Sequence, residues 1–381
     1  MLFSRECRDN MPDSTFFLFG PRMTGKTSII REIEAADYYD LLDPELELSL
    51  RSSPQTFWQQ ISAHGDSSTI IIDEIQRIPE LLNYVQMGID RKSQRFILSG
   101  SSARKLKRGG ANLLGGRALN LKLHPLTHKE LENHVSIDTI ISYGSLPRVA
   151  SLCVADDFDM VRQYLKSYVQ IYLKEEIQAE ALTRNLGAFQ RFLNIAAQAN
   201  GQVIEYQNIS RDCAVPASTV KEYFQILEDT LIGFLLWPFD RSERAKARPK
   251  FYLFDCGVVR AIQNRLTDPP TPEEKGVLFE TWLVNELMHI RDYMHKEHEF
   301  SFWRNRTHEI DILISGGHGP ICAIECKSGN ADISKTTVAA FQQNFPGVRL
   351  MVASLKDERP RTCRGIEIMP WKNILEMYRQ L

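Results

Sequence analysis

The chain has 381 residues, which at roughly 150 residues per domain predicts two or three domains and excludes one small domain. Hydrophobic residues make up 43% of the sequence and charged residues 25%, a composition that excludes global disorder. The 46 Lys and Arg residues nearly balance the 48 Asp and Glu residues. The formal net charge of −2 therefore excludes a strong overall attraction to nucleic acid or anionic lipid, and any such contact must be local.

The sequence shows no targeting or disulfide signal. It contains no run of about 18 apolar residues, and residues 1–11 lack the apolar core of a secretory signal. The seven cysteines are scattered and form no CxxC pair, which is typical of a reducing compartment. We therefore expect a cytoplasmic protein without a membrane partner and without a sulfur-ligated metal.

The first motif predicts a phosphate-binding loop. Residues 15–19 (TFFLF) read as a strand, residues 20–27 (GPRMTGKT) as a loop, and the following SIIREIEA as a helix. Lys26 would reach the β and γ phosphates of ATP, or the β phosphate of ADP, as a catalytic cation, and the Thr27 hydroxyl would coordinate Mg²⁺. The alternative is a chance glycine-rich turn. The nucleotide-binding residues that this motif predicts are Gly20, Pro21, Arg22, Thr24, Gly25, Lys26, Thr27 and Ser28.

A second motif places two carboxylates after a buried strand. Residues 69–72 (TIII) predict a strand covered on both faces, and Asp73 and Glu74 follow it directly. Ligands of open α/β sheets bind at the carboxyl ends of strands, so Asp73 would hold Mg²⁺ and Glu74 would polarise the attacking water. The alternative is that Asp73 only caps a helix.

A third strand at residues 95–98 ends in small polar residues, of which Ser99 is the candidate to reach the γ-phosphate or the water. Arg104, Arg108 and Arg117 follow as candidates for an arginine finger, although a solvated basic face is the favoured interpretation for most of them.

These residues resemble the AAA-type ATPases, and more narrowly a prokaryotic family that joins such a core to a C-terminal domain of restriction-endonuclease-like fold. The shared segments are residues 20–27, 70–76 (IIIDEIQ), 98–102 (LSGSS) and 116–126, and the pattern PKFYxxDxG at residues 249–257 also matches. Met23 departs from the polar residue expected at its loop position. The resemblance implies ATP hydrolysis and does not identify an arginine finger, so monomer through hexamer stays open.

The middle of the chain predicts a helical connector. Helical periodicity runs over residues 156–182 and 187–199, with tyrosines at 164, 168 and 172 that read as a packed stripe. Residues 204–254 then read as helix, turn, helix, strand and return strand, the order of a winged helix. The loop between the strands carries Arg241, Arg244, Lys246, Arg248 and Lys250. It would lie on DNA phosphates, with Ser218, Thr219 and Lys221 opening the recognition helix, or the module is an interdomain spacer.

A proline-rich acidic linker at residues 267–274 precedes the last domain. A helix over residues 276–287 carries Glu280, and residues 300–304, 308–315 and 320–328 predict strands. Period-two alternation puts Ile310, Ile312 and Ile314 on one face of the second strand and Asp311 on the other. In the third strand, Glu325 and Lys327 lie opposite Cys322, Ile324 and Cys326.

Glu280, Asp311 and Glu325 are therefore predicted to converge with Lys327. Carboxylates held together need a cation or a proton, so the sequence predicts Mg²⁺ or Mn²⁺ on the three carboxylates, with Asp311, Glu325 and Lys327 in catalytic roles. This pattern resembles the PD-(D/E)xK nuclease fold. A surface salt bridge of Lys327 would use the same residue types.

We therefore expect an α/β protein with an AAA-type P-loop ATPase core over residues 1–150, a helical connector with a winged helix over residues 151–266, and a PD-(D/E)xK nuclease-like domain over residues 267–381. The function expected is ATP hydrolysis coupled to DNA binding and to a magnesium-dependent nuclease domain. The alternative is an ATP-dependent switch whose last domain binds a partner protein or nucleic acid without cleaving it.

Overall fold

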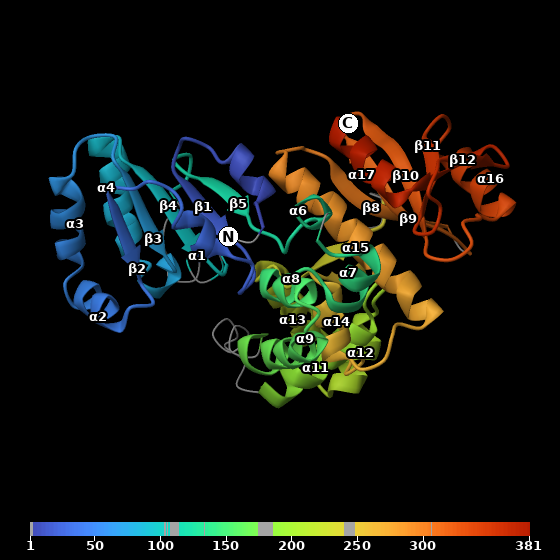
Figure 1. Ribbon diagram of the computed structural model, residues 1–381, viewed down its shortest axis with the longest axis horizontal. Helices are drawn as coiled ribbons and strands as arrows, with labels where there is room; N and C mark the ends of the chain where they lie inside the picture. The colour runs from blue at the N-terminus through green and yellow to red at the C-terminus, as the bar shows by residue number, and fades with distance from the viewer. Residues whose placement is uncertain are drawn as a thin grey trace.

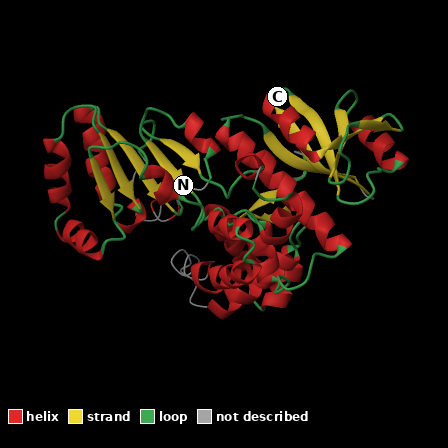
Figure 2. Cartoon of the chain, viewed as in Figure 1, coloured by secondary structure: helices red, strands yellow, loops and turns green. Residues whose placement is uncertain are grey.

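The computed structural model describes residues 3–102, 104, 106, 114–132, 134–173, 186–239, 248–305 and 307–381. The N-terminal sheet, at the left of Figure 1, and the C-terminal sheet, at the upper right, are separated by a group of helices and by the long helix α15 (Pro272–Tyr293). Figure 2 shows that most of the central region is helical, whereas strands gather at the two ends. Within the described residues, no helix is long and apolar enough to cross a bilayer.

The N-terminal sheet is fully parallel, with strand order β2-β3-β4-β1-β5. Its strands β1 and β3 are buried along almost their whole length, because helices cover both faces of the sheet. The strands are β1 (Phe16–Phe19), β2 (Asp37–Asp40), β3 (Thr69–Asp73), β4 (Arg95–Gly100) and β5 (Leu119–Lys122). The helices are η1 (Glu6–Asn10), α1 (Lys26–Ile30), α2 (Pro44–Ser52), α3 (Pro54–Ala63), η2 (Ile75–Arg77) and α4 (Leu81–Lys92).

Strand alternation divides the N-terminal core into two layers. Phe17, Ile70 and Ile72 point into one cluster of buried side chains, and Phe16 and Ile71 point into another on the opposite face. The sheet is therefore held from both sides, and its carboxyl edge, where β1 and β3 end, has a fixed geometry.

The connector confirms the predicted order of two helices and a strand hairpin. Three helices that begin within the range predicted for the first domain pack with the connector and are described with it: α6 (His128–Leu131), α7 (Ile137–Tyr143) and α8 (Pro147–Val154). The further elements of the connector are α9 (Phe158–Ser167), η3 (Tyr168–Leu173), α11 (Leu186–Gln198), α12 (Tyr206–Cys213), α13 (Ala217–Asp229), β6 (Gly233–Leu236), β7 (Lys250–Leu253) and α14 (Cys256–Ile262). Strands β6 and β7 pair antiparallel.

The helix expected over residues 156–182 differs from the observed one. It begins at Phe158, because the Asp157 side chain accepts a hydrogen bond from Met160 N and caps its first turn. After Ser167 the backbone continues as the π-helical segment η3. Residues 174–182 of the predicted helix lie outside the described residues. Tyr168 is buried, as a packed stripe requires.

The C-terminal domain is a mixed sheet of order β12-β13-β11-β10-β9-β8 with helices on its faces. Its strands are β8 (Glu299–Asn305), β9 (His308–Gly316), β10 (Gly319–Lys327), β11 (Arg349–Ser354), β12 (Arg361–Cys363) and β13 (Ile366–Pro370), and its further helices are α16 (Lys335–Asn344) and α17 (Trp371–Gln380). Helix α15 begins inside the predicted linker, because Thr271 caps it and Pro272 fits its first turn.

Connector and C-terminal domain share one continuous core. A single cluster of buried side chains joins Val149 of α8, Phe224 of α13, Leu283 of α15 and Ile324 of β10. Helices α7 and α8, which fall within the range predicted for the first domain, also pack in this cluster. Rearrangement between these two parts would therefore expose apolar surface.

Candidate functional site

The loop after β1 forms a cradle of backbone groups. Lys26 is almost completely buried, and its Nζ donates to the carbonyl oxygens of Gly20 at 2.7 Å and Pro21 at 3.0 Å. Thr24 Oγ1 donates to the Pro21 carbonyl at 2.9 Å. Gly25 has a φ of 98°, a conformation that favours glycine, and it starts helix α1. A Cβ at Gly20 would collide with the carbonyl oxygen of Leu123. The loop geometry therefore depends on both glycines.

The carboxylate of Asp73 is the centre of a buried hydrogen-bond group. Asp73 has no exposed surface, and its Oδ2 accepts from Thr27 Oγ1 at 2.7 Å and from Tyr38 OH at 2.9 Å. Ser99 Oγ donates to the other carboxylate oxygen. These contacts join α1, β2 and β4 to the carboxyl end of β3. Asp73 makes these contacts instead of capping a helix, so the alternative assignment of a helix cap does not hold.

Glu74 follows in a left-handed conformation. Its φ is 62°, which is uncommon for a residue other than glycine and is found where structure around the residue enforces it. Its backbone N donates to Ser99 Oγ at 3.1 Å, and its carboxylate accepts a hydrogen bond from Gln76 Nε2. Two contacts thus fix the backbone and side chain of Glu74 beside the loop.

A cavity of about 830 Å³ opens over these groups. Of the predicted nucleotide-binding residues, Arg22, Gly25, Lys26, Thr27 and Ser28 line it, together with Glu74. The remaining predicted residues, Gly20, Pro21, Thr24, Asp73 and Ser99, form the layer that supports this lining through the contacts above.

The cavity also contains residues that the sequence did not suggest. Arg148, at the start of α8 in the connector, is exposed and lines the cavity, and it makes no hydrogen bond or ion pair within the part of the chain that the structure describes. Arg51 and Arg77 line it as well, but both pair with Glu47. Arg148 therefore brings an unengaged cation from a second domain to the phosphate-binding loop. Its sequence position, more than a hundred residues away, gave no signal.

The predicted arginine fingers have other partners. Arg104 pairs with Asp229 of the connector, and Arg117 pairs with Asp90 at 2.7 Å. Arg108 lies outside the described residues. The two described arginines are therefore engaged in surface and interdomain ion pairs.

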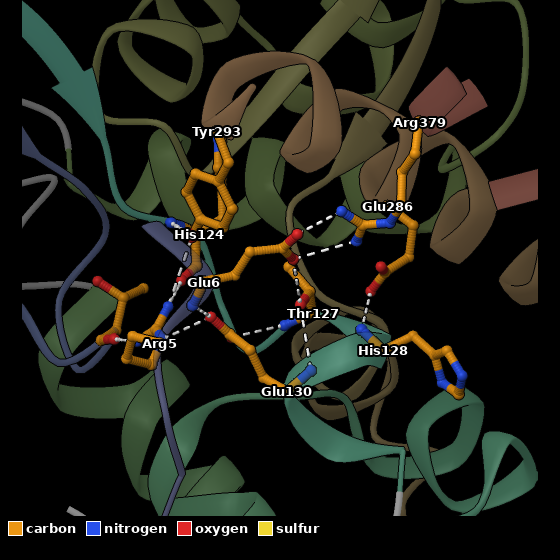
Figure 3. A network of polar contacts seen from close by, with 10 residues as sticks. Arg5, Glu6, His124, Thr127, His128, Glu130, Glu286, Tyr293 and Arg379 are labelled. Atoms are coloured by element: carbon orange, nitrogen blue, oxygen red, sulfur yellow. Dashed lines mark hydrogen bonds and ion pairs between the residues drawn. The ribbon is translucent and has the colours of Figure 1, made fainter. Parts of the chain in front are cut away.

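Arg5 ties the loop to distant parts of the chain (Figure 3). The residue is only 2% exposed, and its guanidinium donates to Thr24 O at 2.6 Å, His124 O at 2.7 Å and Glu130 Oε1 at 3.2 Å. It also lies 3.4 Å from the hydroxyl of Tyr293, near the end of α15. One buried arginine thus contacts the phosphate-binding loop, the segment before α6 and the long helix of the C-terminal domain.

Glu6 extends this network to the C-terminal helix (Figure 3). Its carboxylate accepts from Thr127 Oγ1 at 3.2 Å and from Arg379 Nη2 of α17 at 3.1 Å. Nearby, Glu286 Oε1 of α15 accepts from His128 N at 2.9 Å. The N-terminal residues therefore join the first and last domains.

The acidic centre of the C-terminal domain contains a lysine from the connector. Lys250, the first residue of β7, is 2% exposed, and its Nζ lies 2.9 Å from Glu280 Oε1, 2.7 Å from Glu309 Oε1 and 3.2 Å from Asp311 Oδ1. Tyr252 OH donates to the same Glu280 oxygen. The sequence had placed Lys250 on the phosphate-facing loop. That assignment is wrong for this residue, because its ammonium group is buried among carboxylates.

The acidic centre is a cluster of buried, oppositely charged side chains. Burial, and next the charge of Asp311, raises the pKa of Glu280 to about 7. Burial alone would lower the pKa of Lys250, but Asp311, Glu280 and Glu309 raise it above its ordinary value, so the lysine stays charged. The one ammonium group therefore offsets part of the negative charge of the three carboxylates around it.

A β-bulge changes the facing that alternation predicted. Ser301 of β8 pairs with Leu313 of β9, and Trp303 pairs with Ile310, so β9 has one more residue than β8 between these two pairs. Ile312 and Ile314 consequently pack in the cluster beneath α15, whereas Ile310 packs in the cluster on the opposite face. The shared face predicted for the three isoleucines is thus wrong at Ile310, and the bulge beside Asp311 lets that carboxylate reach Lys250.

Glu325 and Lys327 form a separate pair. Lys327 Nζ lies 2.7 Å from Glu325 Oε1, and burial, with the charge of Asp311 next, raises the pKa of Glu325 to about 7. The only direct contact between β10 and Asp311 among those found in the described residues is from Cys326 N to Asp311 Oδ2, at 2.9 Å. Glu325 and Lys327 therefore form their own ion pair, but burial, and next the charge of Asp311, raises the pKa of both Glu280 and Glu325, so these four residues interact electrostatically as one group with Lys250.

The two predicted magnesium sites differ in whether their residues could hold the ion. At the loop, the Thr27 hydroxyl and the Asp73 carboxylate are oxygen donors of the kind that Mg²⁺ takes alongside phosphate oxygens and water, so these residues fit. In the C-terminal domain they do not, because Lys250 occupies the space among Glu280, Glu309 and Asp311. Across the described residues, no group of three or more His, Cys, Asp or Glu side chains is placed to hold a metal ion.

Three family models match successive parts of the chain. Residues 13–132 match the AAA domain, residues 135–268 match a domain of unknown function (DUF8612), and residues 275–374 match a second domain of unknown function (DUF4143). Together with the loop geometry, the first match identifies residues 13–132 as a P-loop ATPase domain of the AAA type. The other two matches carry no assigned activity.

Curated relatives extend across these domains. An uncharacterized protein of Mycobacterium tuberculosis is 24% identical over 307 residues, which span 78% of this chain and 66% of the relative. An uncharacterized protein of Methanocaldococcus jannaschii is 21% identical over 377 residues, or 91% of this chain and 82% of the relative. The chain thus covers 66% of the length of the mycobacterial protein, and similarity to the archaeal protein runs through all three matched regions.

Among solved structures, the Aeropyrum pernix ORC1 protein in complex with DNA aligns with a TM-score of 0.27 at 13% identity, covering 69% of this chain and 89% of that chain. The replication initiator DnaA bound to AMPPCP and single-stranded DNA aligns with a TM-score of 0.28 at 13% identity, covering 58% and 86%. Neither likeness carries a functional assignment.

Proposed function

We propose that the AAA-type domain binds and hydrolyses one ATP between the loop at residues 20–27 and Asp73, and that turnover controls the connector and the C-terminal domain. The observation that carries the proposal is the contact of Thr27 with Asp73 at 2.7 Å beneath an 830 Å³ cavity. It brings the hydroxyl and the carboxylate together with Lys26 at a single sheet edge, the position where open α/β sheets bind ligands.

Each residue has a role that follows from its position. Backbone N–H groups at the start of α1 and the Lys26 ammonium attract the phosphates. Mg²⁺ held by Thr27 and Asp73 would neutralise charge on the phosphates. Glu74, held by Ser99 and Gln76, accepts a proton from the attacking water. Ser99 supports both Asp73 and Glu74, so it positions the acidic side of the site.

Two arginines, Arg148 and Arg5, support the coupling of ATP turnover to the other domains. Arg148 extends from the connector into the cavity and is available to pair with a phosphate. Arg5 joins the Thr24 carbonyl of the loop to Glu130 and to the hydroxyl of Tyr293 on α15. Phosphate binding would therefore change the interactions of groups that reach into both other domains.

DNA is the partner we propose for the connector. Helices α12 and α13 and the β6–β7 hairpin have the element order of a winged helix, and Ser218 and Lys221 at the start of α13 are exposed. Arg248 is also exposed, although it pairs with Glu205 at 2.9 Å. Arg241, Arg244 and Lys246 lie outside the described residues. Lys221, the one basic residue of α13, would contact a phosphate and position the module.

For the C-terminal domain we propose binding without cleavage, the action of an ATP-dependent switch. The position of Lys250 favours this over the metal-dependent nuclease that the sequence pattern suggests, because its ammonium group pairs with Glu280 and Asp311, where the metal would bind. Plasmid and single-stranded DNA incubated with Mg²⁺ or Mn²⁺ should stay intact with the wild type. Cleavage that is lost in Asp311→Ala and in Lys327→Ala would instead establish the nuclease.

The ATPase itself is tested by a pair of variants. Lys26→Ala should lose both ATP binding and hydrolysis. Glu74→Gln keeps shape and hydrogen bonding but cannot accept the proton, so kcat should fall about 10²-fold or more while ATP still binds. Phosphate release measured with Mg²⁺ and ATP, alongside ATP affinity, distinguishes the two roles. Hydrolysis at the wild-type rate in Glu74→Gln would remove that residue from the mechanism.

A further inference from the structure

One segment of the connector holds the turn that precedes Arg148. The pattern PKFYxxDxG, at residues 249–257, ends at the start of α14, a fully buried helix that lies beside α7 in the central group of helices (Figure 1). Its Asp255 and Gly257 take no part in the binding of ATP proposed above. Both lie against the end of α7 and the turn after it, and this turn leads into α8, which begins with Pro147 and Arg148 at the nucleotide cavity.

Asp255 holds two backbone segments with its two carboxylate oxygens. Its Oδ1 accepts from Val258 N at 3.0 Å and caps α14, and its Oδ2 accepts from Ser145 N, in the turn between α7 and α8, at 2.7 Å. Asp255 is only 4% exposed, so water hardly competes for these contacts. Burial raises the pKa of its carboxyl group to about 6, so at pH 8 the group is ionised and both oxygens accept.

The turn and the start of α14 approach each other too closely to admit side chains between them. A Cβ at Gly144, which has a φ of 79°, would lie 2.0 Å from Asp255 Oδ1. A Cβ at Gly257 would lie 1.9 Å from the carbonyl oxygen of Tyr143, the last residue of α7. The two glycines therefore allow the carboxylate of Asp255 to reach the backbone of the turn.

The turn leads directly to the arginine of the nucleotide cavity. Ser145 and Leu146 are buried, and the Ser145 carbonyl accepts from Leu126 N of the first domain at 2.9 Å. Pro147 then restricts the backbone at the first position of α8, and Arg148 follows it, exposed and at the cavity. The backbone that leads to Arg148 is thus held from the connector on one side and from the first domain on the other.

We propose that Asp255 is a positioning residue for ATP turnover, which holds the turn between α7 and α8 so that the Arg148 guanidinium can pair with a phosphate of bound ATP. Asp255 touches no substrate and acts only through Arg148. The inference rests on the proposed function and goes beyond it, because it gives a role to the pattern at residues 249–257. Lys250, near the start of this pattern, enters the acidic centre of the C-terminal domain, and Asp255, near its end, orients the cation of the nucleotide cavity.

A double-mutant cycle tests this role. In Asp255→Ser, the shorter side chain keeps an oxygen that can cap α14 and loses the oxygen that accepts from Ser145 N. Asp255→Asn converts one acceptor oxygen into an amino donor, so the cap and the turn cannot both be held. Each change is made in the wild type and in Arg148→Ala, and kcat is measured at pH 8 with Mg²⁺ and ATP.

We expect either change to lower the kcat of the wild type about tenfold or more, because a displaced charge no longer meets the phosphate. In the Arg148→Ala background the same changes should lower kcat by less than about twofold, since the side chain that Asp255 positions is already gone.

Asp157→Asn is the matched control for these variants. It alters the cap of α9 in the same connector, where the carboxylate accepts from Met160 N, and it should leave kcat unchanged in both backgrounds. Urea midpoints measured for every variant show which of them are folded under the assay conditions.

Three results would overturn the inference and leave the ATP site standing. Equal losses of kcat in the wild-type and Arg148→Ala backgrounds would show that Asp255 does not act through Arg148. Unchanged kcat in both Asp255 variants would show that the turn does not need this contact. Arg148→Ala protein that hydrolyses ATP as the wild type does would remove the residue on which the inference depends. A wild type that hydrolyses no ATP would overturn the proposed turnover and, with it, the inference.

Discussion

At the scale of single residues, the ATP site depends on contacts that converge on Asp73. Thr27 comes from the loop, Tyr38 from β2 and Ser99 from β4, and all three donate to this one buried carboxylate. A carboxylate so surrounded is held in one orientation without help from solvent. This explains how the edge of the sheet can hold oxygen atoms that could bind Mg²⁺ in a fixed position beside an open cavity.

Arg148 provides a test of phosphate recognition from the second domain. It is exposed and unengaged in the described structure, so Arg148→Ala should leave the unfolding midpoint unchanged. If the Arg148 charge stabilises the transferred phosphate, its removal should lower kcat on the order of 10²-fold. Arg162→Ala, which changes a partly exposed arginine of α9 that pairs with Asp159, serves as the control and should hydrolyse ATP normally. Unchanged turnover in Arg148→Ala would exclude a role in hydrolysis.

Much of this site could be predicted from the sequence because its parts are local. Lys26 and Thr27 stand at fixed spacing after Gly20, and Asp73 ends a strand that its own composition reveals. Tyr38 and Arg148 could not be found in this way. Their positions depend on strand order and on domain packing, neither of which leaves a pattern in the neighbouring residues.

At the scale of elements, strand β7 closes the acidic face of the C-terminal domain. Its first residue, Lys250, places one ammonium group among three carboxylates. The sequence predicted the strand correctly but assigned its lysine to the surface, because alternation along a short strand does not reveal what another domain contributes. The bulge in β9 was equally hidden, and it redirects Asp311.

Lys250→Met should therefore destabilise the protein strongly. Removing one partner of a buried ion pair leaves its carboxylates uncompensated, at a cost of about 3–5 kcal/mol in the free energy of unfolding. Adding Glu280→Gln to Lys250→Met should recover part of that loss, since one of the repelling charges is removed. Urea denaturation measures both effects. Lys275→Met, which removes a partly exposed pair with Asp138, is the control and should cost about 1 kcal/mol or less. An equally small loss of stability in Lys250→Met would contradict the conclusion that Lys250 compensates the three carboxylates.

Helix α15 carries a second buried carboxyl with a measurable pH dependence. Burial raises the pKa of Glu286 from 4.5 to about 8. Between these values the folded protein keeps a proton that the unfolded chain has lost, so this residue makes stability fall as pH rises. Glu286→Gln has no proton to lose. Its stability relative to the wild type should rise between pH 5 and pH 8, by on the order of 1 kcal/mol per pH unit.

Urea midpoints at both pH values test this dependence. Glu273→Gln changes an exposed carboxylate in the first turn of the same helix and should follow the wild type at each pH. If the curves for Glu286→Gln and the wild type stay parallel, the buried carboxyl does not titrate in this range.

At the scale of the whole molecule, the first and last domains meet at the N-terminal residues (Figure 3). Arg5 contacts the phosphate-binding loop and α15, and Glu6 pairs with Arg379 of α17. The division into an ATPase core, a connector and a C-terminal domain is a prediction from changes in sequence pattern. This network could not be predicted, because its members are separated by up to several hundred residues.

Arg5→Lys tests whether the network supports the ATP site. Lysine keeps the charge but cannot reproduce the planar fork that reaches Thr24 O, His124 O and Glu130 together. We expect weaker ATP binding and a lower unfolding midpoint. Arg8→Lys, which changes a partly exposed arginine paired with Glu32, should alter neither. ATP affinity equal to the wild type in Arg5→Lys would show that the loop does not depend on this contact.

The central claim is that one nucleotide binds between the loop at residues 20–27 and Asp73. Isothermal titration calorimetry with ADP and a non-hydrolysable ATP analogue in the presence of Mg²⁺ measures it directly. The account predicts one site per chain in the wild type and no measurable binding in Lys26→Ala. Wild-type protein that releases or absorbs no heat with either nucleotide, or Lys26→Ala protein that binds as tightly as the wild type, would contradict it.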